Sequence, residues 1–187
     1  MRYMPDARGL LLDAVIVELD RAGIRDRSLR DIAEAVGTSH RMLLHHFGSR
    51  EDMFVAVVDV VEARERARTV ASRSQIDADP AAAFRATWRR LANPRQAGRE
   101  RLFFECYARG LQGEAPFDRM LPGAVDSWLA LTTDLNIAAG LSRPRAKAQA
   151  RMALALIRGM LLDLLATGDR RGTTAAIDAF VELLVRT

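Results

Sequence analysis

The sequence is poor in cysteine and in long apolar runs. Its single cysteine, Cys106, excludes an internal disulfide and suits a reducing compartment. No apolar stretch approaches the roughly eighteen residues needed to span a bilayer, because Arg158 and Asp163 interrupt the longest one. The run Leu10–Leu12 ends at Asp13 and is too short to be the core of a signal peptide. We therefore expect a cytoplasmic protein that does not associate with a membrane.

Aromatic residues are also sparse, at 6%, and Lys147 is the only lysine, so arginine supplies nearly all the positive charge. Apolar residues make up 49% of the 187-residue chain and charged residues 28%, a composition typical of a soluble globular protein with a sizeable core. The net charge is +4, yet residues 1–52 hold eight arginines against nine acidic residues. A nucleic-acid function must therefore be argued from the local placement of charge.

Helical periodicity runs through almost the whole chain, whereas the alternation that marks a strand never persists. Caps, glycines and prolines define the ends of the expected helices. These cover residues 6–22, 29–36, 40–46, 50–72, 80–92, 96–110, 122–139, 144–167 and 173–186, about nine in all. Residues 75–80 are expected to be a linker. The predicted fold is all-α, with three helices at the N-terminus followed by a C-terminal helical bundle.

Two short helices joined by a brief break form the most informative pattern. Residues 29–36 follow Ser28, a good N-cap residue, and Gly37 separates them from residues 40–46. This arrangement is typical of a helix-turn-helix, whose second helix lies in the DNA major groove. Periodicity alone leaves open a helical hairpin without a DNA role.

The charge around the second helix favours DNA. Between Gly37 and Arg50 there is no acidic residue, and this window holds all three histidines of the chain. Hydroxyls, arginines and helix N-termini bind phosphates, and arginine suits guanine. We expect His40 and Arg41 to contact bases. Phosphate contacts are expected from Ser28, Thr38, Ser39, His45 and Arg50, and Arg30 and Met42 complete the candidate DNA-binding set.

Metal and cofactor chemistry finds no support in the sequence. His40, His45 and His46 have spacings that do not put two of them on one helical face, so we expect no metal site. We also find no Gly-rich phosphate loop and no nucleophile with a plausible base. The chain is therefore not expected to be an enzyme, and no cofactor is expected.

Residues 7–61 resemble the DNA-binding region of the TetR/AcrR (tetracycline-repressor) family. The resemblance rests on Leu11–Val15, Gly23, Ser28–Ala33, Ala35–Ser39, Leu43, His46–Phe47 and Ser49–Met53. There are three departures. Leu44 stands where the family usually has a phosphate-binding Tyr, Arg41 where it has a small Gly, and Arg50 where it has Lys.

The resemblance implies a ligand-responsive transcriptional repressor with residues 1–52 as the DNA-binding domain and residues 53–187 as a ligand-binding and dimerisation domain. Past Met152, the helix expected at residues 144–167 is apolar nearly all round, so it must be buried on most sides. Together with residues 173–186 it is expected to form a homodimer interface, which would space two reading helices by one turn of a palindromic operator. A monomeric bundle core remains the alternative.

A cluster of aromatic residues suggests where a small hydrophobic effector would bind. The predicted pocket comprises Trp88, Phe103, Phe104, Glu105, Tyr107, Phe117, Met120, Trp128 and Arg158. Ordinary core packing is the alternative for each of them. The rival function is a helical small-molecule-binding or scaffold protein with a weakened helix-turn-helix, which Leu44 favours. Neither the effector nor the operator follows from the sequence.

Overall fold

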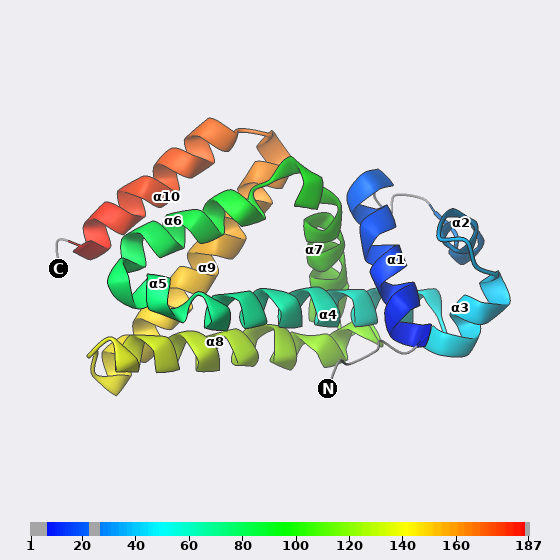
Figure 1. Ribbon diagram of the computed structural model, residues 1–187, viewed down its shortest axis with the longest axis horizontal. Helices are drawn as coiled ribbons and strands as arrows, with labels where there is room; N and C mark the ends of the chain where they lie inside the picture. Colours follow the sequence, from blue (N-terminus) through cyan, green and yellow to red (C-terminus); the bar gives the residue numbers. More distant parts are fainter. Residues whose placement is uncertain (1–6, 23–26, 186–187) are drawn as a thin grey trace. The chain divides into compact units, whose positions relative to one another are not determined.

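The computed structural model describes residues 7–22 and 27–185 (Figure 1). Over these residues it is helical, with ten α-helices, two short 3-10 turns and no strand. The α-helices are α1 (Ala7–Ala22), α2 (Leu29–Ala35), α3 (His40–Phe47), α4 (Arg50–Ala71), α5 (Arg73–Ala78), α6 (Pro80–Leu91), α7 (Ala97–Leu111), α8 (Met120–Ala138), α9 (Arg143–Thr167) and α10 (Arg170–Val185). The 3-10 turns are η1 (Pro94–Gln96) and η2 (Phe117–Arg119). The predicted all-α fold is confirmed. Gly23, one of the residues on which the family resemblance rests, lies outside the described residues.

Two expectations about the elements were wrong. The expected linker at residues 75–80 overlaps the helix α5 (Arg73–Ala78), which brings the described helices to ten. The last helix begins at Arg170, three residues before the expected start, because Asp169 accepts a hydrogen bond from the backbone N of Gly172 at 2.8 Å. Glycine suits this site, since a β-carbon on Gly172 would collide with the Asp169 carboxylate.

The chain divides into two compact units. The first contains Met1–Glu62 and Arg95–Leu121, and the second contains Ala63–Pro94 and Pro122–Thr187. The helices α4 and α8 contribute to both. The first unit thus joins the three N-terminal helices to α7, which begins 50 positions after α3 ends. The functional division after residue 52 stays a prediction.

In the first unit, α1 packs against α7 and α2 packs against α3. The helix α1 buries one apolar stripe, which consists of Leu12, Val15, Ile16 and Leu19. Met53 and Phe54, in the first turns of α4, are fully buried as well. Burial of this kind, at about 1.5–3 kcal/mol for each large apolar side chain, provides the main stabilisation of a small helical unit.

In the second unit, α10 packs against α6 and α9. Trp88 of α6 is 1% exposed and its indole Nε1 donates a hydrogen bond to Thr174 Oγ1 at 3.0 Å. Arg85 pairs with Asp178 across the same two helices at 2.7 Å. Ile177 and Val181, four positions apart on α10, are buried in this packing.

Candidate nucleic-acid interface

The helices α2 and α3 with the turn between them form the helix-turn-helix, here called the reading motif. Its first helix, α2, begins at a capping box. Ser28 Oγ accepts a hydrogen bond from the backbone N of Asp31 at 3.2 Å, and the Asp31 carboxylate accepts one from the backbone N of Ser28 at 2.8 Å. These two donors have no partner within the helix, so the box stabilises its first turn. The hydrogen bond from the Ser28 side chain lowers the pKa of Asp31.

The turn between the helices depends on glycine. Gly37 has a φ of +72°, a left-handed conformation that residues with a side chain rarely adopt. After it, the backbone N of Thr38 donates to Ala33 O at 2.9 Å and closes the end of α2. Ser39 then caps α3, because its Oγ accepts from the backbone N of Met42 at 3.2 Å. These contacts fix the direction in which α3 leaves the turn.

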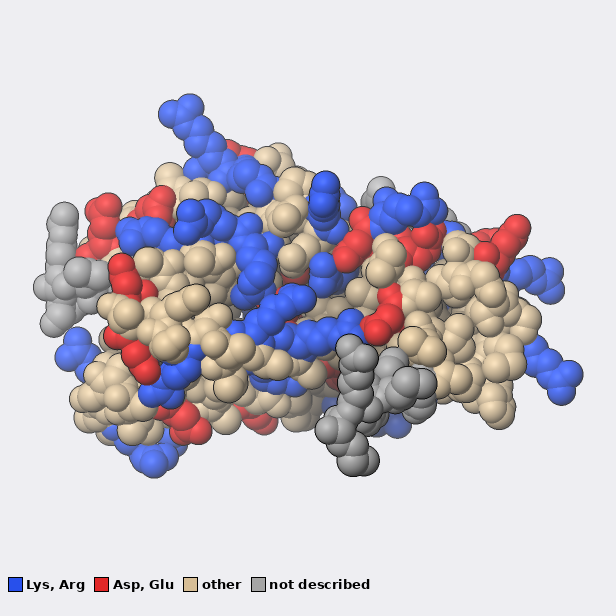
Figure 2. All heavy atoms as spheres, viewed as in Figure 1, with Lys and Arg blue, Asp and Glu red and all other residues tan. Residues whose placement is uncertain are grey.

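The helix α3 has one buried face and a broad exposed one. Leu43 is fully buried and Phe47 is 7% exposed, so these two anchor the helix to the unit. The exposed side chains are His40, Arg41, Met42, Leu44 and His45. In Figure 2 the surface over α3, at the right of the view, is mostly tan, with basic side chains extending at its edge. The described geometry therefore leaves the predicted reading residues accessible to a groove.

The remaining predicted DNA-binding residues differ in exposure and in the contacts that they already make within the protein. Ser28, Arg30 and Ser39 are exposed, and Thr38 is half-buried. The guanidinium of Arg50 is already used within the protein, because its Nε donates to Arg27 O at 3.1 Å and it lies over the Phe54 ring at 4.4 Å. Arg50 thus ties the start of α4 to the segment that precedes α2.

Sequence reasoning missed the ion cluster beneath this motif. Glu18 of α1 is 7% exposed and its carboxylate accepts hydrogen bonds from Arg21 at 2.8 Å and from Arg27 at 2.6 Å. These bonds lower the pKa of Glu18 from 4.5 to about 2. The signal in the sequence was an acid at helical spacing within the apolar stripe of α1. Such a buried acid requires a partner.

A second missed contact involves Arg8, near the start of α1. Its Nε donates to His46 O at 3.3 Å and its guanidinium lies over the Phe47 ring at 5.1 Å. Arg8 therefore joins α1 to the end of α3. No sequence pattern pointed to this pairing, because the partner is a backbone carbonyl.

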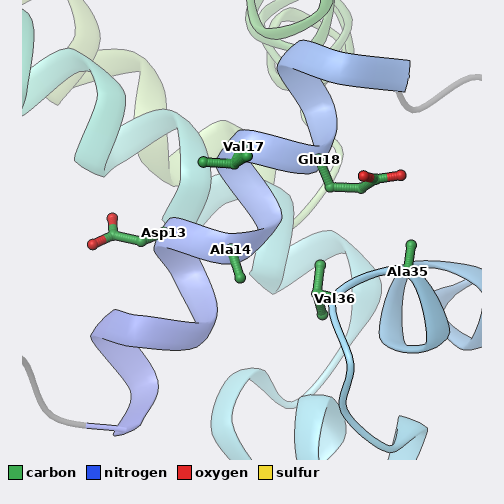
Figure 3. Close-up of a pocket in the computed structure, with 6 residues that line it drawn as sticks. All are labelled: Asp13, Ala14, Val17, Glu18, Ala35 and Val36. Carbon is green, nitrogen blue, oxygen red and sulfur yellow. The ribbon is translucent and has the colours of Figure 1, made fainter.

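A hollow of about 400 Å³ opens between α1, α2 and the turn that follows α2 (Figure 3). It is lined by Asp13, Ala14, Val17, Glu18, Ala35 and Val36. None of the residues predicted to bind an effector lines this hollow.

The predicted effector residues fall in both compact units. In the first unit, Phe103 of α7 is buried and its ring lies 5.3 Å from that of Phe104 and 5.6 Å from that of Tyr107. Glu105 of the same helix is exposed. Phe117 and Met120 are buried in this unit too.

The other three predicted pocket residues belong to the second unit. Trp88 is buried, and Trp128 is half-buried with Arg66 over its ring at 6.0 Å. Arg158 of α9 donates to Ala124 O at 2.7 Å, so part of its guanidinium is used within the unit. A shared effector pocket stays a prediction.

Cys106 is 1% exposed in α7, and burial raises the pKa of its thiol to about 12. Such a thiol is protonated and inert at neutral pH. Among the residues that the structure describes, no group of three or more His, Cys, Asp or Glu side chains could hold a metal ion. No helix in the described ranges is long and apolar enough to cross a membrane.

Comparison with known proteins decides what the motif is. Residues 11–57, which span α1 to the first turns of α4, match the family model of bacterial regulatory proteins of the tetR family. The N-terminal domain of the chain, over residues 11–57, is that of the TetR family. The match covers the capping box, the glycine turn and the whole of α3. Regulators of this family are transcription factors with a helix-turn-helix, not enzymes.

Solved structures show the same fold over nearly the whole chain. A transcriptional regulator from Rhodococcus sp. Rha1 is 18% identical, with a TM-score of 0.73 and coverage of 97% of both chains. FadR of Thermus thermophilus, a TetR-family repressor solved with lauroyl-CoA, is 17% identical, with a TM-score of 0.65 and coverage of 95% of this chain and 93% of that one. No curated protein sequence matches the chain.

Proposed function

We propose that this chain is a homodimeric, cytoplasmic repressor that binds a palindromic operator and is released by a small hydrophobic effector. The observation that carries the proposal is the exposed face of α3, which is free of acidic residues and belongs to a family-matched helix-turn-helix. A helix of this kind can enter the major groove without placing a carboxylate against the phosphates.

Two classes of DNA contact follow from the exposed residues. Arg41 and His40, in the first turn of α3, reach outward and would contact base edges. Phosphate contacts would come from the hydroxyls of Ser39 and Thr38, from His45 and Arg30, and from the remaining N–H groups of Arg50. Ser28, whose hydroxyl donates to the Asp31 carboxylate at 2.7 Å, and Met42 complete the candidate set. We assign specificity to the first class and most of the affinity to the second.

The helices α9 and α10 support a dimer. Exposed apolar or small residues recur every three or four positions on α9, at Met152, Ala155, Gly159, Leu162 and Ala166. A similar stripe on α10 comprises Ala176, Ala179 and Leu183. Leu162 is 53% exposed and Leu183 is 66% exposed, which is a large apolar area to leave in water. Two such pairs of helices can form an isologous four-helix interface.

The position of α7 supports control by an effector. This helix carries the Phe103 and Tyr107 rings and packs on α1 in the same compact unit. Arg99 of α7 forms a two-point ion pair with Asp20 of α1, with both distances at 2.9 Å. A ligand that displaces α7 would therefore displace the helix that supports the reading motif. Only a ligand that prefers the displaced conformation can release DNA.

The test is specific DNA binding. Duplexes selected from a random pool by the full-length protein would be titrated at several salt concentrations. We expect nanomolar-range affinity for the selected palindrome, weak binding to scrambled DNA and a steep fall of affinity with salt. Equal and weak binding to all duplexes would contradict the proposal and favour the scaffold function.

Two further measurements test the proposed base contact and the proposed effector. Arg41→Ala should reduce the ratio between selected and scrambled DNA, whereas Arg170→Ala, a matched change at an exposed residue of α10, should not. Lauroyl-CoA, the ligand of the Thermus protein, is the first effector probe. Release of the duplex by this compound would identify an acyl-CoA as the effector class, and its failure would exclude that class alone.

A further inference from the structure

The exposed face of α3 contains two large apolar side chains beside its polar ones. Leu44 is 38% exposed and Met42 is 41% exposed. Neither is needed to anchor the helix, because Leu43 and Phe47 perform that task on the opposite face. An isolated exposed leucine on a surface requires no explanation, but this one lies on the helix that would enter the groove.

Leu44 is placed beside the two residues expected to read bases. It follows His40 by four positions and Arg41 by three in an unbroken helix, so all three are neighbours on the exposed surface. Helical side chains lean towards the N-terminus, which directs Leu44 over the turn that carries His40 and Arg41. Met42 instead neighbours His45 and His46, further from that pair.

We propose that Leu44 is a specificity-determining residue that contacts the 5-methyl group of a thymine in each operator half-site. The inference rests on the proposed DNA-binding function and adds the chemistry of one contact. A leucine side chain can neither donate nor accept a hydrogen bond, so it cannot replace a polar phosphate contact. In the major groove the thymine methyl is the one apolar group that a base pair presents, and contact with it separates T·A from the other pairs.

The same contact explains how an apolar residue can remain on a DNA-facing surface. Against a methyl group, the exposed part of Leu44 would lose its contact with water on binding and gain dispersion contacts. Against a phosphate or a cytosine amino group, it would desolvate a polar group without satisfying it. The site therefore selects for thymine by attraction to the methyl and by the cost of the alternatives.

The experiment removes the methyl from the DNA and the side chain from the protein. The full-length protein would select its own duplex from a random pool, and each thymine of that duplex would be replaced in turn by deoxyuridine, which keeps all hydrogen-bonding groups. Loss of one buried methyl-sized contact corresponds to about a fourfold weaker Kd, and symmetric replacement in both half-sites to roughly fifteenfold. In Leu44→Ala, replacement at that same position should cost nothing.

Matched variants complete the cycle. Leu44→Met keeps an apolar side chain and should retain the deoxyuridine cost. Leu10→Ala makes the same change at a 57% exposed leucine of α1 and should behave like the parent protein. Met42→Ala removes the other apolar side chain of the face and should leave the cost unchanged.

The outcomes separate this inference from the proposed function. Specific binding with a methyl cost that disappears only in Leu44→Ala supports both. Specific binding in which no thymine methyl matters, or in which the cost disappears in Met42→Ala but persists in Leu44→Ala, overturns the role of Leu44 and leaves the DNA-binding function standing. Absence of specific binding by the parent protein overturns both.

Discussion

Individual charged residues in the first unit mainly serve the structure of the reading motif. Glu18 is held by Arg21 and Arg27, and Arg27 also donates to Asp31 O at 3.4 Å. The Glu18 carboxylate thereby joins α1 to the first turn of α2. Because the side chain of Glu18 is only 9% exposed, its pairing contributes more than a surface ion pair would.

The pH dependence of stability should reveal this cluster. Glu18→Gln should lower the free energy of unfolding by about 1–2 kcal/mol at neutral pH, because hydrogen bonds to a charged group are lost. The lowered pKa of Glu18 means that the ionised form is favoured in the folded state. Its contribution is therefore complete above pH 4.5 and is lost as the pH falls towards about 2.

Urea unfolding of both proteins across this range would measure the effect. The difference between parent and variant should be constant near neutrality and should shrink as the pH falls below 4.5. Glu34→Gln, at an exposed residue of α2, is the matched control and should show little difference. A difference for Glu18→Gln that is independent of pH would contradict the role of its ionised form.

At the scale of elements, the helix boundaries were largely predictable because capping chemistry is local. Ser28, Gly37 and Ser39 mark the ends of α2 and α3 in the sequence and in the structure. The helix α5 escaped prediction because its six residues bury no side chain and so leave no apolar pattern. The packing of α7 on α1 could not be predicted from the sequence either, since a pairing across about eighty residues leaves no local pattern.

The same limit applies to the candidate site. The sequence identified the exposed residues of α3, because its two buried residues follow helical spacing. It could not separate residues free for DNA from residues already engaged. Arg50 illustrates this, since the carbonyl of Arg27 that it binds lies 23 positions earlier.

The link between α4 and α2 yields a second prediction. Arg50→Ala removes the hydrogen bond to Arg27 O and the contact with Phe54, so the free energy of unfolding should fall by about 1–2 kcal/mol. Affinity for selected and for scrambled DNA should fall together. Arg50→Lys keeps the charge but loses the planar guanidinium, so it should restore most of the DNA affinity and little of the stability. If urea unfolding gives the same free energy for Arg50→Ala as for the parent protein, this link does not contribute to stability.

On the scale of the whole molecule, the first unit contains both the reading helices and α7. An effector bound at α7, as proposed above, would need no long path to the helix-turn-helix, because α1 contacts α7 directly. The second unit contains α9 and α10, whose exposed stripes are suited to association. In the proposed dimer, recognition of a palindrome would depend on association through the second unit, because two copies of α3 must be spaced by roughly 34 Å.

Disruption of the exposed stripes should separate association from folding. Leu162→Glu places a carboxylate on the α9 stripe, and an isologous interface would bring two copies of it together without a counter-charge. Sedimentation velocity should show the monomer at concentrations at which the parent is a dimer. Val70→Glu makes a similar change at a 55% exposed residue of α4, outside these stripes, and should remain dimeric. The monomeric variant should keep its helical circular dichroism and lose the preference for a full palindrome over a single half-site, because one α3 helix contacts too few bases to be selective. A Leu162→Glu protein that sediments as a dimer would exclude this face of α9 from the interface.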